Sequence, residues 1–264
     1  MTNLAGNCAR LAKAGLATGL LIGLAGCAAL MPVDAPKTEV SAFSAVAAGD
    51  TMPPGWHPRP LSRFKINTRY RLVNDATGVT VIEARAEQSA SALGKSLNID
   101  PHAKPWIHWR WQVPQLIADA DNHHRHLEDS PVRVIVTFDG DMNKLDVEER
   151  AIAARAKALT GQPMPYATLM YIWENKAAAN TVIESAHTSR IKMIVAESGD
   201  TRSGAWLEYE RNITRDFEKA FGEKPGRIRS LGIMTDTDNT GASTLAYYGD
   251  IRFTARPLHA ENQR

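Results

Sequence analysis

The stretch PWIHWRWQV at residues 105–113 is the clearest strand signal in this 264-residue chain. Successive side chains of a strand point to opposite faces of a sheet, so the stretch predicts one apolar face and one polar face. The apolar face would carry Ile107, Trp109, Trp111 and Val113, and the polar face Trp106, His108, Arg110 and Gln112. Two tryptophans two residues apart are typical of a buried core. The polar face fits either solvent surface or the floor of a groove that meets sugar hydroxyls or a carboxylate.

Short strand-like runs alternate with turn signals on both sides of this stretch. Residues 69–73 and 79–84 flank an Asn, Asp and Gly turn and predict a hairpin. Further runs lie at 91–93, 96–99, 133–138, 168–173, 181–184, 190–195, 206–210, 229–235 and 245–253. We expect only two helices, at 144–159 and 214–221, because each helical pattern is followed by a glycine. This order predicts an all-β, mostly antiparallel fold, a jelly-roll-like β-sandwich with two short surface helices.

The N-terminus has the pattern of a bacterial lipoprotein signal. Arg10 and Lys13 precede an apolar stretch that ends in LAGC at residues 24–27. The resemblance to lipoproteins implies that Cys27 becomes the acylated first residue, and Ala28 after it favours sorting to the outer membrane. We therefore expect a signal peptide at 1–26, a lipidated tether at 27–62, a sandwich at 63–256 and a tail at 257–264. The protein would face the periplasm in the bacterial cell envelope and contact the membrane through its lipid.

Charge and cysteine content exclude several functions. Removal of residues 1–26 would take away Arg10 and Lys13, and with them the net charge of +2. No basic face then suggests nucleic acid as a partner. Cys8 would leave with the signal, so the mature domain would offer no thiol for a disulfide, a metal site or catalysis.

Several phrases of the sequence, taken in order, resemble one bacterial family. They are SASAL at 89–93, PWIHWRWQV at 105–113, an acidic pair before PVRV at 128–134, TLMYIW at 168–173, ERN at 210–212, DFEKAFGEKP at 216–225, and MTDTDNTG with YYGDI at 234–251. The chain is similar over residues 63–254 to the domain of unknown function 3047 (DUF3047) family. The resemblance implies no established activity. Family members carry Asp-Asp before the Arg strand, where this chain has Glu128 and Asp129.

The loop at residues 236–241, DTDNTG, is open to three interpretations. It begins like a calcium-binding EF-hand loop, but Thr240 stands where an acid or Asn is usual and Tyr247 where Glu is expected. The loop is also a fitting turn between two strands. We favour a loop stiffened by its own side-chain bonds that presents spare acceptors at the rim of a groove. We predict no cofactor, with calcium as the alternative. On the strand that follows, alternation would place Tyr248, Asp250 and Arg252 on one face.

These observations predict a domain that binds a polar, glycan-like ligand without catalysis. The predicted binding residues are Trp106, His108, Arg110, Arg133, Glu208, Asp236, Asp238, Asn239 and Asp250. One alternative is a glycosidase-like hydrolase that uses Glu208 with Glu210 or Asp250, since carboxylates two residues apart on a strand can meet one substrate. Another is an envelope scaffold lipoprotein that contacts a second envelope protein through a flat apolar patch.

Overall fold

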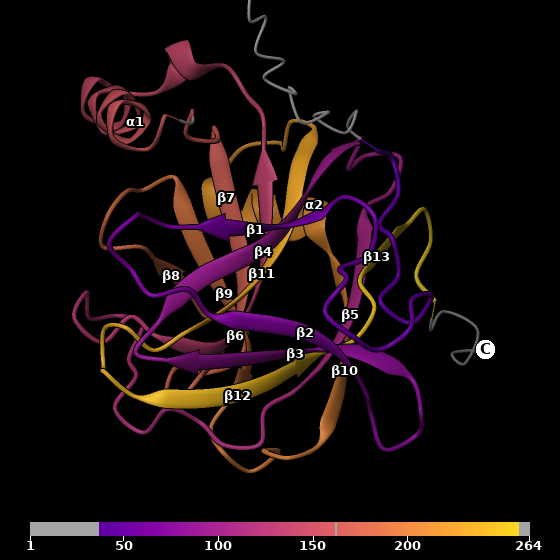
Figure 1. The fold of residues 1–264 in the computed structure, drawn as a ribbon. Helices are drawn as coiled ribbons and strands as arrows, with labels where there is room; N and C mark the ends of the chain where they lie inside the picture. The colour runs from indigo at the N-terminus through magenta and orange to yellow at the C-terminus, as the bar shows by residue number, and fades with distance from the viewer. Residues whose placement is uncertain (1–36, 162, 259–264) are drawn as a thin grey trace, which may run out of the picture. The chain divides into compact units, whose positions relative to one another are not determined.

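The computed structural model describes residues 37–161 and 163–258, and within them two β-sheets pack face to face (Figure 1). Cys27 and the predicted signal peptide lie outside the described residues. The first sheet has the order β1 (Trp56–Pro60), β4 (Ala90–Ile99), β11 (Ile228–Asp236), β6 (Ser130–Phe138), β7 (Ala167–Glu174), β9 (Ile191–Ser198) and β8 (Val182–Glu184). The second has the order β10 (Trp206–Asn212), β5 (Trp106–Gln112), β12 (Ser243–Tyr248), β3 (Thr80–Glu87) and β2 (Arg69–Asn74), and β13 (Arg252–Thr254) also pairs with β5. Neighbouring strands are antiparallel except β7 and β9, so the predicted all-β sandwich is confirmed.

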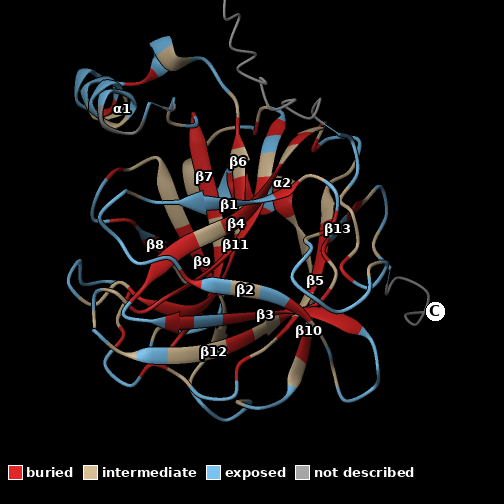
Figure 2. Cartoon of the chain, in the orientation of Figure 1, coloured by how far each residue is buried: buried red, intermediate tan, exposed pale blue. Residues whose placement is uncertain are grey.

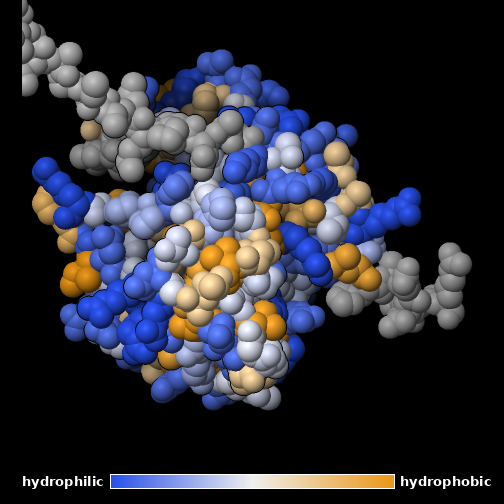
Figure 3. Space-filling view, turned by 45° about the vertical axis from the view of Figure 1, so that its right-hand side comes forward, coloured by the Kyte–Doolittle hydropathy of each residue, from blue (hydrophilic) through white to orange (hydrophobic). Residues whose placement is uncertain are grey.

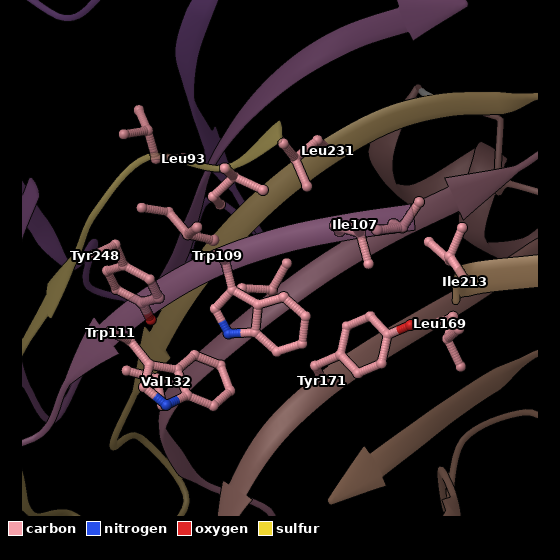
Figure 4. Close-up of a cluster of buried hydrophobic side chains, with 14 of the residues drawn as sticks. Leu93, Ile107, Trp109, Trp111, Val132, Leu169, Tyr171, Ile213, Leu231 and Tyr248 are labelled. Carbon is pink, nitrogen blue, oxygen red and sulfur yellow. The ribbon is translucent and has the colours of Figure 1, made fainter. Parts of the chain in front are cut away.

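The core lies between the sheets, as the alternation in β5 predicts. Trp109 and Trp111 are 2% and 0% exposed and point inward from the second sheet (Figure 4). Trp109 stacks on Tyr171 of β7 in the opposite sheet, with 4.7 Å between ring centroids. The two layers are therefore joined by direct aromatic contact. A fully buried side chain of this size contributes several kcal/mol to folding by area, roughly 25 cal/mol per Å² of apolar surface.

The two helices pack to different depths. Helix α1 (Val147–Thr160) begins at Asp146, whose side chain accepts from the Glu149 amide, and ends at Gly161 in the left-handed conformation. It is mostly exposed, and a short 3₁₀ turn (Met142–Lys144) leads into it (Figure 2). Helix α2 (Ile213–Phe221) instead inserts Phe217 into the core against Phe138. No helix in the described ranges is long and apolar enough to cross a membrane.

The packed region begins before the predicted boundary at residue 63. Phe43 and Trp56 are 1% and 2% exposed and join the core, and β1 adds an edge strand to the first sheet. Lys95 of β4, itself 1% exposed, donates to the Pro54 carbonyl and the Ser41 hydroxyl. The described part of the predicted tether is therefore part of the fold. Its apolar residues are too irregularly spaced to give a periodic signal.

The C-terminal strands decide one open alternative and correct one expectation. Of the interpretations of the 236–241 loop, a hairpin turn does not hold, because β11 belongs to the first sheet and β12 to the second. The predicted strand at 245–253 is also interrupted between β12 and β13. The interruption changes the alternation, so Tyr248 is buried in the core while Asp250 and Arg252 point to the other side.

Candidate functional site

The outer face of the second sheet carries ordered rows of polar and aromatic side chains. In the antiparallel register Glu208 of β10 lies opposite Arg110 of β5, and Glu210 lies opposite His108. On the other side of β5, Arg252 of β13 lies opposite His108. Side chains directly opposite in such a pair are about 5 Å apart at Cβ. Strand pairing thus gathers charged groups from three strands around the middle of β5.

Arg110 is held in place from three sides. Its Nη2 donates to the Asp75 carboxylate at 3.0 Å, and its guanidinium lies 4.3 Å from the ring centroid of Trp206. Its side chain also passes over Gly249, where an added Cβ would come within 2.4 Å of the Arg110 Cγ and Nε. A glycine is therefore required at position 249 by the path of the arginine rather than by backbone conformation.

The acid that orients Arg110 is itself fixed in the β2–β3 turn. Partial burial tends to raise the pKa of Asp75, but hydrogen bonds from Thr77, Val79 and Arg110 outweigh it and hold that pKa below its ordinary value. The carboxylate is 4% exposed. Asp75 therefore stays ionised at neutral pH and keeps Arg110 directed along the sheet surface.

His108 is a buried side chain on this face of the sheet. Its Nε2 is 2.7 Å from the Thr254 hydroxyl, and its Nδ1 is 3.3 Å from the Glu210 carboxylate. Glu210 also accepts from the Leu258 amide at 2.6 Å. These contacts use both ring nitrogens of His108 and one oxygen of Glu210, and they fix the orientation of the imidazole ring on the sheet.

Two charged groups in the same place are open to solvent. The side chains of Glu208 and Arg252 are exposed, and neither has a hydrogen bond or ion pair within residues 37–161 and 163–258. Asp250 lies beside them, and its carboxylate accepts from the amide and hydroxyl of Ser44 at 3.0 and 2.5 Å. Glu208 as a free hydrogen-bond acceptor and Arg252 as a free donor therefore lie beside charged side chains that the protein already holds in position.

A pocket of about 260 Å³ lies among these groups. It is lined by His108, Arg110, Glu208, Asp250, Arg252 and Leu258, together with Trp109 of β5 and Tyr209 of β10. Larger hollows of about 400 and 590 Å³ lie beside the loop at 114–118, where most lining residues are uncharged. Another of about 570 Å³ lies against α1, and its charged lining residues include none of the nine predicted site residues. We take the smaller pocket as the candidate site because recognition of a polar ligand depends on convergent polar groups more than on volume.

Four predicted site residues lie elsewhere, around the first sheet. Arg133 of β6 and Asp236 of β11 are 2% and 3% exposed, and the guanidinium donates twice to the carboxylate at 3.0 and 3.2 Å. Burial alone would lower the pKa of Arg133, and the attraction of Asp236 outweighs it. Burial raises the pKa of Asp236 to about 6, so both groups are charged at neutral pH. The pair fixes β6 to β11 and does not reach the pocket on the second sheet.

Asp129 fastens the 236–241 loop to this pair. Its carboxylate accepts from the amides of Asn239 and Thr240 and from the Thr240 hydroxyl, at 2.7–3.2 Å. Ligand atoms of Asp129, Asp236 and Asp238 lie within 4.8 Å of one another, which is close enough for a shared cation. Most of these oxygens, however, already accept from Arg133, Lys65 and loop amides. Two cations partly neutralise the three carboxylates, one oxygen of Asp238 is buried without a hydrogen-bond partner among the described residues, and the calcium alternative stays a prediction.

The structure thus divides the nine predicted residues into two groups. Trp106, His108, Arg110, Glu208 and Asp250 share the outer face of the second sheet, and four of them line the pocket. Arg133, Asp236, Asp238 and Asn239 form the separate network. Sequence reasoning assigned no role to Arg252, although it placed this residue on the last strand. It also missed Asp75 and Trp206, which hold the Arg110 side chain in position.

Most of the residues that line the pocket are charged or polar. In the view of Figure 3 hydrophilic residues dominate, and apolar residues form small groups between them. Trp206 and Tyr247 also lie on this outer face, with 6.5 Å between their ring centroids. Aromatic faces beside hydrogen-bonding groups are a combination that suits sugars and other partly apolar polar ligands.

Comparison with known proteins identifies the family but not the ligand. A family model described as a protein of unknown function, DUF3047, matches residues 54–252. No curated protein matches the chain. Among solved structures, an arabinose-bound α-L-arabinofuranosidase is 8% identical with a TM-score of 0.39, and the match covers 83% of this chain but only 26% of that enzyme.

Two smaller solved proteins match at similar levels. A family 30 carbohydrate-binding module of a cellulosomal cellulase from Clostridium thermocellum is 8% identical, with a TM-score of 0.32 and coverage of 83% of this chain and 94% of the module. The cellulose-induced protein Cip1 is 9% identical, with a TM-score of 0.34 and coverage of 80% and 98%. Similarity this low carries no argument about the ligand, so the function has to be argued from the pocket itself.

Proposed function

This chain belongs to the DUF3047 family of proteins of unknown function, and we propose from its own geometry that it binds a polar, glycan-like ligand at the pocket on the second sheet. One observation carries the proposal. Charged side chains from β5, β10, β13 and the loop before β13 converge on one hollow, while the apolar residues of the same strands face the core. Sheet pairing alone gathers these charges, and their convergence is what recognition of a polar ligand needs.

The free groups define the chemistry of the ligand. Glu208 can accept hydrogen bonds and Arg252 can donate them, while Arg110 and Asp250 are held by protein partners. The two free groups stand on strands either side of β5, about 10–12 Å apart at Cα by strand spacing. A hydroxyl-rich molecule can act as donor toward Glu208 and as acceptor toward Arg252. This is why a glycan fits better than a simple anion or cation.

The arrangement supports binding rather than hydrolysis. A glycosidase needs two carboxylates free to act on one bond, about 5–5.5 Å apart for retention and 6.5–9.5 Å for inversion. Glu210 is engaged by the Leu258 amide and His108, and Asp250 is engaged by Ser44. Only Glu208 of the three candidate acids has a side chain without a protein partner in the described residues.

The binding proposal is tested on a glycan array with fluorescently labelled chain, with and without calcium. We expect binding to a subset of glycans that persists when calcium is chelated. Replacing Arg252 with alanine should weaken it about tenfold or more, because a hydrogen bond to a charged group contributes about 1.5–3 kcal/mol. The matched control is Arg215→Ala on α2, an exposed arginine that does not line the pocket. Equal loss in both variants, or no glycan bound, would count against the proposal.

We also propose that the protein is a lipoprotein of the cell envelope, anchored through Cys27 with its domain in the periplasm. The support is the order of basic residues, apolar stretch and LAGC box at residues 10–27. Mass spectrometry of the N-terminal peptide from bacterial membranes should show acylated Cys27. A chain with an intact N-terminus, or with a cut elsewhere, would refute the anchor and leave the pocket unaffected.

A further inference from the structure

One corner of the sandwich combines exposed apolar side chains with arginines. It consists of residues 59–69, which lead from β1 into β2, and of Arg85 on β3 beside β2; we call it the basic corner. β1 is one edge strand of the first sheet and β2 is one edge strand of the second, so this segment crosses from an edge of one sheet to an edge of the other (Figure 1). The Ile66 carbonyl accepts from the Ala90 amide, which fixes the segment to the start of β4.

The apolar part of the corner is unusual in its exposure. Leu61, Phe64 and Ile66 are 41%, 82% and 63% exposed. They are half of the six large apolar side chains that are exposed in the described part of the chain, and they lie within six residues. Phe64 exposes a large apolar ring, and the guanidinium of Arg63 lies 4.7 Å from its centroid.

The charged side chains of the basic corner are all cationic. Between Asp50 and Asp75 the chain contains no acidic residue. Lys65 is paired with Asp238, but Arg59, Arg63 and Arg69 are exposed and have no carboxylate partner in residues 37–161 and 163–258.

The pairing of β2 with β3 adds a second, independent sign of an anionic partner. Arg69 lies directly opposite Arg85 in the antiparallel register, and both side chains are exposed. Like charges directly opposite each other destabilise a strand pair. Arg85 also has no carboxylate partner among the described residues. The cost of holding the two arginines together is relieved when an anion lies across them.

We propose that the basic corner docks on the surface of an anionic lipid bilayer. Exposed aromatic and aliphatic tips enter the boundary between headgroups and acyl chains, and arginines around them meet the phosphates. A purely electrostatic ligand would explain the arginines and leave the exposed Phe64 and Ile66 without a role. An apolar protein partner would explain Phe64 and Ile66 and leave the unpaired charges without a role. The bilayer accounts for both.

Docking at this corner leaves the pocket accessible. The corner lies at the end of β3 near Glu87, whereas Asp75, which holds Arg110, lies at its other end near Thr80. Arg85, the part of the corner on β3, is five residues from Thr80, about 17 Å along the strand. The inference goes beyond the proposed ligand binding and does not depend on it.

The test measures hydrogen exchange of the full chain on vesicles. We compare vesicles of phosphatidylcholine alone with vesicles of phosphatidylcholine and phosphatidylglycerol. Exchange is read locally, so membrane contact made by the N-terminal leader does not obscure it. We expect backbone amides of residues 61–67 to exchange at least several-fold more slowly on the anionic vesicles, and peptides around the pocket to be unchanged.

Two variants separate the contribution of the arginines from that of the apolar side chains. Arg59→Gln with Arg69→Gln should weaken the anionic-vesicle effect by about fivefold per arginine, and Phe64→Ser should weaken it at constant charge. The matched control, Arg215→Gln with Val147→Ser, removes an exposed cation and an exposed apolar side chain from the helices and should change nothing. The proposal is overturned if residues 61–67 exchange equally on both vesicle types, or if soluble polyphosphate gives the same protection as the vesicles.

Discussion

Adding one methyl group at Gly249 should displace Arg110 and release the ties that hold it. In the structure a Cβ at this position would lie 2.4 Å from both the Cγ and the Nε of Arg110 and 2.9 Å from its Cδ. The backbone of Gly249 is not in the left-handed region, so alanine is acceptable to the main chain itself. The arginine must therefore move, and the Gly249→Ala effect should come from the side chain of Arg110.

The magnitude follows from the contacts that would be lost. The cation–π contact with Trp206 at 4.3 Å contributes about 0.5–1 kcal/mol. The ion pair with Asp75 at 3.0 Å contributes about 0.5–1 kcal/mol, because the Arg110 side chain is partly exposed. Gly249→Ala should thus lower the free energy of unfolding by about 1–2 kcal/mol. In an Arg110→Ala background the same substitution should be neutral, or stabilising by about 0.4–1 kcal/mol through the entropy of the unfolded chain.

Urea unfolding of the four proteins, followed by tryptophan fluorescence, measures this coupling. The midpoint should fall for Gly249→Ala alone, with the slope of the transition unchanged. A loss of stability that is the same with and without Arg110 would show that the backbone, not the arginine, demands glycine, and would refute the reasoning.

Three further predictions concern other parts of the fold. Burial tends to raise the pKa of Glu149, but hydrogen bonds from Ser189 and Thr188 outweigh burial and lower that pKa. The ionised Glu149 therefore stabilises the fold fully above the unfolded-state pKa of about 4.3, and this stabilisation is lost as the pH falls below that value. Melting curves from pH 6 to pH 3 should therefore show Glu149→Gln less stable than the parent chain at pH 6, with the difference shrinking at pH 3; a constant difference would contradict this. Asp129→Ala should lower the free energy of unfolding by about 2–4 kcal/mol in urea, because three buried or half-buried donors lose their acceptor, and a change below about 0.5 kcal/mol would contradict the role of Asp129. Trp109→Ala should cost about 3–5 kcal/mol in the same assay, and a loss near that of an exposed residue would show that the sheets do not pack through it.

The sequence predicts those parts of the fold that depend on local alternation. The inward and outward sets of β5, the β2–β3 hairpin and most strand positions follow from side-chain period and turn residues. Strand order does not, because it depends on which distant strands pair. The adjacency of β4, β11 and β6 joins segments ninety or more residues apart, and nothing local in any of them signals it.

The candidate site shows the same limit. Alternation correctly places Arg110 and Glu208 outward, and strand pairing brings them together. Arg133 carries the same side chain but lies in the other sheet, where Asp236 neutralises it inside the protein. The break after Tyr248 reverses the expected faces, because one irregular residue in a strand exchanges all positions beyond it. Site prediction therefore fails where pairing between distant strands, or a single irregular position, decides the outcome.

The most direct test of the central claim is thermal melting of the chain across a panel of neutral and acidic oligosaccharides. We predict that at least one saccharide raises the melting temperature of the unmodified chain and of the control Arg215→Gln/Glu218→Gln. The same saccharide should give no shift with Glu208→Gln/Arg252→Gln, which removes the two open charges of the pocket. An equal shift in the pocket variant would contradict the account, as would a panel in which no saccharide stabilises the chain.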